Sequence, residues 1–445
     1  MRVAFYTDGG QCAISWARRL LDEGCEVLVY NKAKEAKDVG RGLIPLTGNL
    51  ETWKTWGKQK PDTIFFFDQS GSGTVADELR NAGRLVVNSG SFMDRLEKDR
   101  EFGEKIAAKI GMKLPPSQSF ATIAAAIEFL QTNPKQEAGD GGWAWKPNRQ
   151  LGSNATFVGK TSAEVIEFLG YAQRTWGDNV SCILQEKISG VSLSTARWWN
   201  GTTWASPVQA TLENKKFMND DKGPATGCSL NLVWFYENDE PRIAKECHYT
   251  ELAAVLMRLK APAGLYDINA IVDHRGAWFL EWTPRLGIDS ELTSQRGIRS
   301  LSKFIHALAT GGDTMQYFNR SHCYMAVRVS VPPYPAEEED VDKLKAGLDV
   351  PIYGADGLWD KFFVMMGVKL TPDGLQTAEP YGFVGVICTR GRSLKRMCDK
   401  IYEYLNEQLR IPNLQYRTDA YEAVKKDLLK MASTGWESTS VLKVN

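Results

Sequence analysis

The stretch that decides the fold is Phe-Leu-Glu-Trp-Thr-Pro-Arg-Leu-Gly, residues 279–287, because it ends an apolar strand pattern with two charged side chains. The acidic one is Glu281 and the basic one is Arg285. Charged groups at the end of a buried strand are costly unless they bind partners of opposite charge, and a metal ion and a phosphate would serve. A structural ion pair between the two side chains is the alternative explanation.

A second strand precedes this stretch and becomes its partner. Residues 264–272, Gly-Leu-Tyr-Asp-Ile-Asn-Ala-Ile-Val, predict a strand, and residues 273–276, Asp-His-Arg-Gly, predict a turn. The two strands then form a hairpin in which Asn269 lies beside Glu281. The pattern leaves open whether Asp267 or Asn269 faces a metal ion.

The composition narrows the class of protein. The chain has 445 residues, enough for two to four domains at roughly 100 to 200 residues per domain. Its 54 basic and 54 acidic residues give a formal net charge of zero, which argues against nucleic acid or a membrane surface as the main partner. The four histidines are not clustered, so neither a histidine metal site nor a nucleophile triad is supported.

The sequence also favours a cytoplasmic location. The longest apolar run, near residues 63–67, is far shorter than the roughly 20 residues of a membrane span. Arg2 is followed by a strand-like pattern rather than the long apolar segment of a secretory signal. The eight cysteines are scattered without a Cys-x-x-Cys pair, which argues against zinc or a disulfide framework.

The order of predicted elements suggests a multidomain protein of the α/β and α+β classes. Residues 1–92 alternate strand and helix, which predicts a parallel sheet covered by helices and a Rossmann-like substrate domain. Residues 93–320 form the predicted central domain, with a mobile lid subdomain at about 115–190, and begin with one charged helix at 94–110. Residues 321–445 predict a mixed α/β domain.

Lys146 is a candidate anion ligand because it ends the apolar strand Trp-Ala-Trp-Lys, and an ammonium suits a phosphate. A surface lysine is the ordinary alternative. The strand that ends at 185–190, Gln-Glu-Lys-Ile-Ser-Gly, is expected to leave its edge backbone exposed, which suits the pairing of an adenine. Any strand followed by a turn would look similar.

A polar segment with lysines and glycines is the second candidate for an anion site. It runs from Glu213-Asn-Lys-Lys to residues 223–227, Gly-Pro-Ala-Thr-Gly, and is predicted to be a loop. Backbone amides at the glycines, together with Lys215, would cradle a phosphate or an acyl phosphate. A solvated basic turn explains the pattern equally well.

The order of these segments resembles glycinamide ribonucleotide synthetase (phosphoribosylamine–glycine ligase) of the ATP-grasp superfamily, over nearly the whole chain. The segments that carry the resemblance are the turn at 9–16, Leu-Glu-Lys-Asp-Arg-Glu-Phe at 96–102, Ala-Trp-Lys-Pro-Asn-Arg at 144–149, the 185–192 hinge, the 213–228 segment, and Leu-Glu-Trp-Thr-Pro-Arg-Leu-Gly at 280–287. The resemblance implies a Rossmann-like pre-ATP-grasp domain, a central ATP-grasp fold and a C-terminal α/β domain.

The resemblance also implies cofactors and roles. ATP and Mg²⁺ (or Mn²⁺) are expected, in an enzyme that joins an amino acid to an amine, such as phosphoribosylamine, through an acyl phosphate in purine biosynthesis. It assigns Arg285 and Lys215 to catalysis, and Glu281, Asn269 and Thr283 to the metal. Nucleotide ligands are Arg100, Lys146, Gln185, Glu186, Lys187, Ile188 and Ser192. Substrate ligands are Gly9, Gly10, Gln11, Gly223, Pro224, Thr226 and Gly227.

The sequence departs from the family pattern at four places. The glycine- and lysine-rich lid is replaced by residues 148–154, Asn-Arg-Gln-Leu-Gly-Ser-Asn. Thr283 stands where the family has a metal-binding Asn, and Ser192 where it has a ribose-binding Glu. The Arg-Glu-His of the first turn is replaced by residues 11–13, Gln-Cys-Ala.

Three hypotheses follow from the sequence. The first is a ligase that makes glycinamide ribonucleotide. The second is an ATP-grasp ligase that joins an amino acid to another amine, for example on a modified nucleotide, and the altered first turn favours it. The third is a nucleotide-binding protein without turnover, which Thr283 and the altered lid favour. A monomer and a homodimer are both compatible with the sequence.

Overall fold

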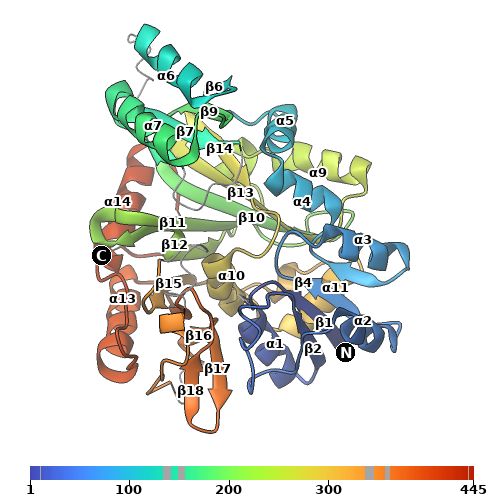
Figure 1. The fold of residues 1–445 in the computed structure, drawn as a ribbon. Coiled ribbons are helices and arrows are strands. Elements are labelled where there is room, and N and C mark those ends of the chain that lie inside the picture. Colours follow the sequence, from blue (N-terminus) through green and yellow to red (C-terminus); the bar gives the residue numbers. More distant parts are fainter. Residues whose placement is uncertain are drawn as a thin grey trace.

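The computed structural model describes residues 1–10, 12–133, 142–148, 156–335, 345–355, 361–438 and 440–444. Its strands form a five-stranded sheet, an eight-stranded sheet, a four-stranded sheet and a two-stranded hairpin. The large sheet lies in the middle, with the N-terminal sheet beside it and the four-stranded sheet at one end of the molecule (Figure 1).

The N-terminal sheet is parallel, as the alternation of strands and helices predicts. The strand order is β3-β2-β1-β4-β5, with β1 (Arg2–Thr7) at the centre. Its other strands are β2 (Glu26–Asn31), β3 (Leu46–Thr47), β4 (Ile64–Phe67) and β5 (Leu85–Val87). Helices α1 (Ala13–Asp22), α2 (Leu50–Lys58) and α3 (Gly73–Asn81) accompany them. The carboxyl ends of β1 and β4 point toward the rest of the molecule, and the backbone N–H of Leu286 donates to Asp68 O at 3.2 Å.

The charged helix expected at 94–110 is two helices, so that prediction is wrong. Helix α4 (Ser91–Lys98) ends at Asp99, and α5 (Arg100–Ile110) begins there. Asp99 has an extended backbone, and its carboxylate accepts a hydrogen bond from Phe102 N at 3.0 Å. An aspartate in this position is an N-cap, which starts a new helix rather than continuing the old one.

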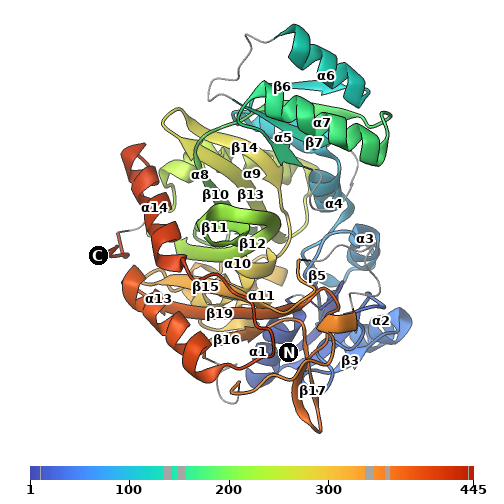
Figure 2. The ribbon, with the colours of Figure 1, turned by 60° about the vertical axis from the view of Figure 1, so that its left-hand side comes forward.

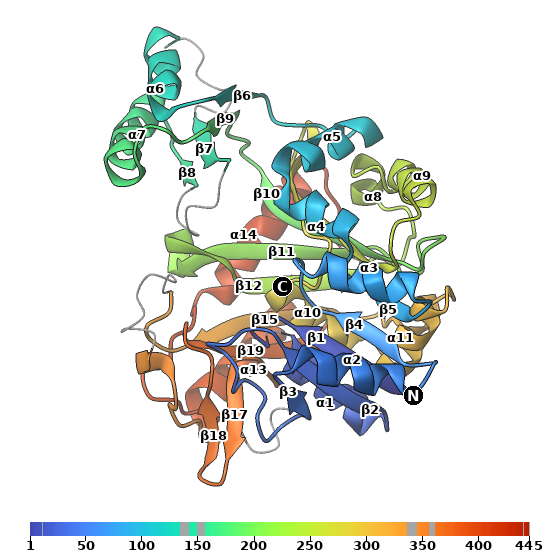
Figure 3. The same ribbon diagram turned by 45° about the vertical axis from the view of Figure 1, so that its right-hand side comes forward.

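The four-stranded sheet has a core of its own. Its order is β6-β9-β7-β8, with β6 (Ser117–Phe120), β7 (Trp143–Pro147), β8 (Phe157–Val158) and β9 (Cys182–Glu186). Helices α6 (Ile123–Thr132) and α7 (Ser162–Trp176) pack on it through buried residues such as Trp145 and Leu169. Figure 3 shows this lobe standing apart from the large sheet.

The eight-stranded sheet has the order β14-β13-β10-β11-β12-β15-β19-β16, and each pair of neighbouring strands is antiparallel. Its strands in chain order are β10 (Val191–Trp199), β11 (Gln209–Met218), β12 (Lys222–Phe235), β13 (Gly264–Asp273), β14 (Gly276–Trp282), β15 (Cys323–Ser330), β16 (Phe363–Met365) and β19 (Phe383–Gly391). The sheet therefore continues across residue 321, because β12 pairs with β15.

Helices cover this sheet, and Figure 2 shows α13 and α14 alongside it. They are α8 (Arg242–Glu246), α9 (Tyr249–Leu259), α10 (Ile288–Ser294), α11 (Leu301–Ala309), α13 (Leu394–Glu403) and α14 (Ala420–Ser433). A short 3-10 turn (Gln295–Gly297) follows α10, and β17 (Val368–Thr371) and β18 (Gly374–Thr377) form the separate hairpin. Across the described ranges, every helix is too short or too polar to cross a membrane.

The polar loop expected between residues 213 and 227 is a β-hairpin instead. Strand β11 continues to Met218, and β12 starts at Lys222. A residue from the C-terminal part of the chain stabilises the tip of this hairpin. The guanidinium of Arg417 donates to Lys216 O and to Asp221 Oδ1, both at 3.1 Å. These partners lie about 200 residues from the hairpin along the chain, so the local pattern does not contain them.

Candidate active site

A cavity of about 150 Å³ opens where β11 to β14 meet α10. It brings together the catalytic and metal candidates of the sequence and two substrate candidates. The lining residues are Glu213, Lys215, Thr226, Gly227, Cys228, Asp267, Asn269, Glu281, Thr283, Arg285, Gly287, Ile288, Asp289, Ser290, Arg328 and Phe383.

The predicted hairpin is confirmed, and a bulge next to Ala270 brings the metal candidates together. Asn269 on β13 lies opposite Glu281 on β14, and Asn269 Nδ2 donates to Thr283 Oγ1 at 2.9 Å. The ammonium of Lys215 lies 3.4 Å from Asn269 Oδ1, 3.8 Å from Glu281 Oε1 and 3.5 Å from Glu213 Oε2. A cationic group thus lies at the point where these oxygens converge.

Both Asp267 and Asn269 line the cavity, because residues two apart on a strand face the same side. Desolvation by burial, with the charges of Glu213 and Glu291, raises the pKa of Asp267 well above its usual range, and the positive charges of Arg285 and Lys215 do not cancel that effect. The carboxyl is therefore available as a ligand that would ionise when a cation binds beside it.

This donor set fits a magnesium ion. Mg²⁺ binds oxygen ligands and takes one or two protein carboxylates together with substrate phosphates and waters. The cavity offers carboxylate, amide and hydroxyl oxygens from Glu281, Asn269 and Thr283. Within the part of the chain that the structure describes, no group of three or more His, Cys, Asp or Glu side chains is arranged to hold a metal alone.

Glu281 is more accessible than its sequence neighbours suggest, since its side chain is 59% exposed. The strand itself is mostly buried, as expected, but Glu281 near its end lines the cavity. Desolvation tends to raise the pKa of Glu281, but the positive charges of Lys215, Lys146 and Arg100 outweigh it and lower the pKa. What marks Glu281 is this surrounding positive charge rather than burial.

Arg285 pairs with a glutamate that the sequence analysis did not single out. Its Nε donates to Glu97 Oε1 on α4 at 3.1 Å, and its Nη1 donates to Leu286 O at 3.0 Å. Desolvation lowers the pKa of Arg285, but the Glu97 carboxylate outweighs it and raises the pKa. Arg285 is thus held at the cavity wall by Glu97, which is not the Glu281 ion pair considered as an alternative.

Lys146 and Arg100 lie close enough to this cavity to interact with it electrostatically. Lys146 Nζ donates to Gln185 Oε1 at 2.6 Å, which links β7 to β9. Desolvation and the positive charge of Arg100 lower the pKa of Lys146 to about 8, while Glu281 acts in the opposite direction. The ammonium is therefore mostly protonated at neutral pH, as a phosphate ligand requires.

The segment predicted as the adenine-binding hinge, which begins at Gln185, does not leave an exposed strand edge as expected. Strand β9 is paired on both sides, with β6 and with β7, so it is not an edge. The N–H of Glu186 donates to Pro116 O at 2.8 Å, and the N–H of Lys187 donates to Gly142 O at 3.0 Å. These two amides are therefore engaged within the protein. Ile188 follows as a buried residue, and Ser192 lies in β10 opposite Ile271.

The substrate candidates at 223–227 divide between the cavity and the hairpin tip. Thr226 and Gly227 line the cavity, and Thr226 Oγ1 donates to Lys215 O at 3.0 Å. Gly223 and Pro224 lie near the tip and are not among the lining residues that the structure describes. The strand geometry of this segment does not form the anion-binding loop that its composition suggests.

The first turn of the chain reaches this cavity only through Cys12, whose Sγ lies 4.0 Å from the backbone oxygen of Ile288, among the residues that the structure describes. Gly10 N donates to Thr7 Oγ1 at 3.1 Å, and Gly9 N donates to Asn31 Oδ1 at 3.1 Å. Gly10 has a φ of +77°, and a Cβ there would lie 2.4 Å from a methyl of Val39, so only glycine fits. Gln11 lies outside the described residues.

A buried ion pair that the sequence analysis missed forms part of the cavity wall. Arg328 on β15 donates to Asp289 on α10 through Nε at 3.1 Å and through Nη2, and its Nη1 donates to Thr226 O at 3.0 Å. Both side chains are almost fully buried. An arginine inside the otherwise apolar pattern of β15 was the available signal.

Comparison with known proteins supports the resemblance. No family model matches the chain. Phosphoribosylamine–glycine ligase of Mycobacterium bovis is 24% identical over 355 residues, which cover 78% of this chain and 79% of that protein.

Solved structures extend the likeness to nearly the whole fold. Phosphoribosylamine–glycine ligase of Thermotoga maritima gives a TM-score of 0.69 at 18% identity and covers 94% of this chain and 100% of that chain. Biotin carboxylase of Campylobacter jejuni gives a TM-score of 0.61 at 10% identity and covers 98% of this chain and 97% of that chain. The chain thus has the multidomain ATP-grasp fold and resembles the phosphoribosylamine–glycine ligases.

Proposed function

We propose that the protein is an ATP-dependent ligase that joins a carboxylate to an amine, with glycine and phosphoribosylamine as its first substrates to test. The observation that carries the proposal is the register of Asn269 with Glu281, which puts a metal-type donor set beside the ammonium of Lys215. The likeness to ligases of this name supports the choice of substrates.

The proposed chemistry has two steps that balance. A carboxylate oxygen attacks the γ-phosphorus of ATP, the bond from that phosphorus to the β–γ bridging oxygen breaks, and ADP leaves with an acyl phosphate formed. The amine then attacks the carbonyl carbon, the carbon–oxygen bond to phosphate breaks, and inorganic phosphate leaves as the nitrogen loses a proton. Both steps depend on positioning and charge neutralisation more than on a covalent protein group.

Each candidate residue has a role in this proposal. Lys146 and Arg100 bind the α- and β-phosphates, and Arg285, held by Glu97, orients the transferred phosphoryl group or the carboxylate. Lys215 neutralises the acyl phosphate next to Thr226 and Gly227. Magnesium or manganese, held by Glu281, Asn269 and Thr283, would neutralise phosphate charge.

The remaining assignments complete the proposal. The segment from Gln185 to Ile188 contacts the adenine, Ser192 lies near the ribose, and Gly9 and Gly10 close the far wall of the substrate site. Gly223 and Pro224 would reach the substrate only if the hairpin tip closes toward the cavity. We place the reaction in purine biosynthesis in the cytoplasm.

A different amine is the second candidate, and the first turn favours it. Cys12 and Ala13 are both buried, and Cys12 Sγ lies 4.0 Å from Ile288 O at the base of the cavity. Burial raises the pKa of the Cys12 thiol well above its usual range, so the thiol stays neutral. Cys12 and Ala13 therefore bring no charge near Ile288, whereas the Arg-Glu-His of the family would bring charged side chains to this turn.

The first experiment tests the activity and the metal assignment together. The protein is incubated with Mg-ATP, glycine and freshly made phosphoribosylamine, ADP is measured, and the amide is identified by mass spectrometry. We expect Glu281→Gln to reduce ADP formation roughly 100-fold. The substitution removes a proposed metal ligand and with it part of the stabilisation of charge in the transition state. Glu101→Gln, an exposed glutamate on α5, is the matched control.

The outcomes separate the hypotheses. Substrate-dependent ADP with the glycinamide product supports the proposal, and ADP that forms only with another amine supports the second candidate. Product formation that Glu281→Gln leaves unchanged contradicts the metal assignment. If the protein binds ATP but forms no ADP with any amine, the result supports the hypothesis of a nucleotide-binding protein without turnover.

A further inference from the structure

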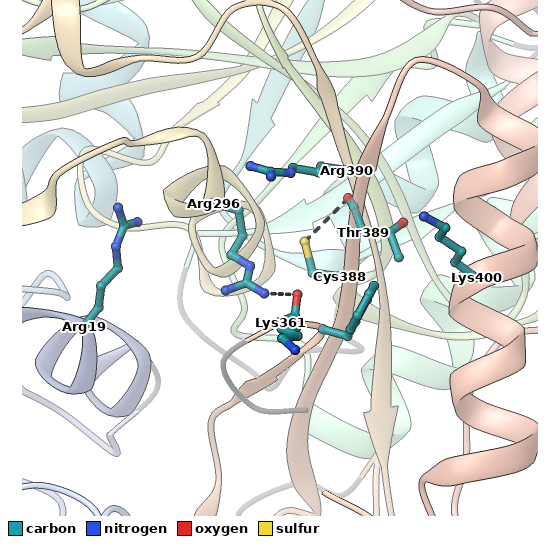
Figure 4. Close-up of a pocket in the computed structure, with 8 residues that line it drawn as sticks. Arg19, Arg296, Lys361, Cys388, Thr389, Arg390 and Lys400 are labelled. Carbon is teal, nitrogen blue, oxygen red and sulfur yellow. Dashed lines mark hydrogen bonds between the residues drawn. The ribbon is translucent and has the colours of Figure 1, made fainter. Parts of the chain in front are cut away.

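A second cavity, of about 430 Å³, lies away from the candidate active site. It opens between α1, the 3-10 turn after α10, the residues that precede β16, and the end of β19 with α13 (Figure 4). The lining residues are Arg19, Arg296, Lys361, Phe362, Cys388, Thr389, Arg390 and Lys400. Its volume falls in the range of small-ligand sites, roughly 300 to 1,000 Å³.

The charge of this cavity has one sign. Among the lining residues that the structure describes, five are cationic and none carries a carboxylate. An adjoining cavity shares Arg390 and Lys400 with the first and adds Arg392, Arg396 and Lys443, again without a carboxylate among its described residues. In a chain whose formal net charge is zero, this is a strong local concentration of positive charge.

Two of these cationic side chains, Arg19 and Arg296, form hydrogen bonds within the protein. Arg19 donates to Gln295 O and Ile298 O and lies 3.4 Å from Glu23, so it joins α1 to the turn after α10. Arg296 donates to Lys361 O. Arg390 and Lys400 are exposed and come from β19 and α13, where Figure 4 shows them on the cavity wall. The positive charge that a ligand would meet is therefore set mainly by Arg390, Lys400 and the exposed Lys361.

We propose that this cavity binds a small molecule carrying two or more linked phosphate groups. Arginine forks and lysine ammonium groups are the side chains that suit phosphate oxygens. The cations come from separate elements around the cavity, so a single phosphate would reach few of them, whereas a linked series spans them. Like charges held together repel, and a bound polyanion relieves that repulsion.

The cavity also has an apolar wall. Phe362 packs on Tyr404 with 4.1 Å between ring centroids. Such a wall would accommodate the organic part of a nucleoside polyphosphate, while inorganic oligophosphate would use the cations alone. Burial raises the pKa of the Cys388 thiol to about 11, so that thiol is not a nucleophile at neutral pH.

The test is a calorimetric titration with inorganic triphosphate in the Lys146→Ala background, which weakens phosphate binding at the candidate active site. We expect one site whose affinity rises from phosphate through pyrophosphate to triphosphate and falls with added salt. The double variant Arg390→Ala/Lys400→Ala should weaken triphosphate binding at least tenfold. Lys395→Ala is the matched control, because it lies on α13, pairs with Asp399 and lines neither cavity.

The arms of the experiment also identify the source of the phosphates. ATP binding that is tighter than triphosphate binding and that the double variant weakens indicates a nucleoside polyphosphate, and equal affinities indicate an inorganic chain. Triphosphate binding that the double variant leaves unchanged overturns the proposal. So does a fluorescent single-stranded RNA that binds the wild type and is not displaced by triphosphate, because the positive charge would then serve nucleic acid.

Discussion

The ammonium of Lys215 lies among the oxygens of Asn269 and Glu281, which we propose as metal ligands. Its ammonium lies within 3.8 Å of oxygens from Glu213, Asn269 and Glu281. Desolvation opposes its charge, but Glu213 and Glu281 outweigh that effect and raise the pKa of Lys215 above its ordinary value. The lysine therefore stays charged and acts as a built-in counter-ion for these side chains.

This placement predicts competition between the lysine and a metal. Lys215→Met should bind Mn²⁺ more tightly than the wild type in the absence of nucleotide, roughly tenfold, because the ammonium no longer competes for the same oxygens. Electron paramagnetic resonance of free Mn²⁺ during a titration measures this affinity. Lys216→Met, on the exposed next residue, is the control, and equal affinities of Lys215→Met and the wild type would rule out the competition.

At the scale of elements, the sequence predicted the strand pairs that are determined by residues close together in the chain. A bulge next to Ala270, which the turn at 273–276 does not encode, brings Asn269 opposite Glu281, but the pairing of β13 with β14 follows from the sequence. The hairpin of β11 and β12 does not, because its tip depends on Arg417. The Arg285 partner likewise comes from α4, which no local pattern connects to residue 285. The lid and domain boundaries remain predictions.

The pair of Arg328 and Asp289 joins β15 to α10 and predicts a large effect on stability. Arg328→Met should lower the free energy of unfolding by about 3–5 kcal/mol, because it leaves a buried carboxylate without its partner. The double variant Arg328→Met/Asp289→Asn should lower the free energy of unfolding by less, because it has no buried carboxylate without a partner. Urea unfolding of the wild type, Arg328→Met and the double variant measures these free energies.

A surface pair provides the control for this prediction. Arg320 and Asp239 also form an ion pair, at 3.0 Å, but Asp239 is 57% exposed. Arg320→Met should therefore change the free energy of unfolding by no more than about 1 kcal/mol. A double variant at Arg328 and Asp289 as unstable as Arg328→Met alone would show that the carboxylate charge is not the cause.

At the scale of the whole molecule, one glutamate attaches the N-terminal sheet to the rest of the chain. Glu23, just after α1, accepts hydrogen bonds from Leu301 N at 2.8 Å and from Ser302 N at 2.7 Å. These are backbone donors at the start of α11, which lack partners inside that helix. A carboxylate from one part of the molecule thus caps a helix in another.

This cap predicts a pH dependence. Burial tends to raise the pKa of Glu23, but the Ser302 and Leu301 hydrogen bonds and Arg19 outweigh it and lower the pKa from 4.5. Because the folded pKa is depressed, the stabilisation is present above pH 4.5 and is lost as the pH falls through the lowered value. Glu23→Gln should cost about 1–3 kcal/mol at neutral pH and much less near about pH 3.

Urea midpoints of the wild type and Glu23→Gln at both pH values measure this effect, with the exposed Glu35→Gln as the control. A difference between wild type and Glu23→Gln that does not shrink in acid would contradict the assigned role of the carboxylate.

The pairing of β12 with β15 decides how this chain can be divided. Leu230 to Val233 face Val327 to Tyr324 across the sheet, and all of these residues are buried. A fragment that stops near residue 321 would end with an apolar strand edge open to solvent, which is a template for pairing with other chains. Separately expressed halves should therefore aggregate, whereas the two parts expressed as one chain should not.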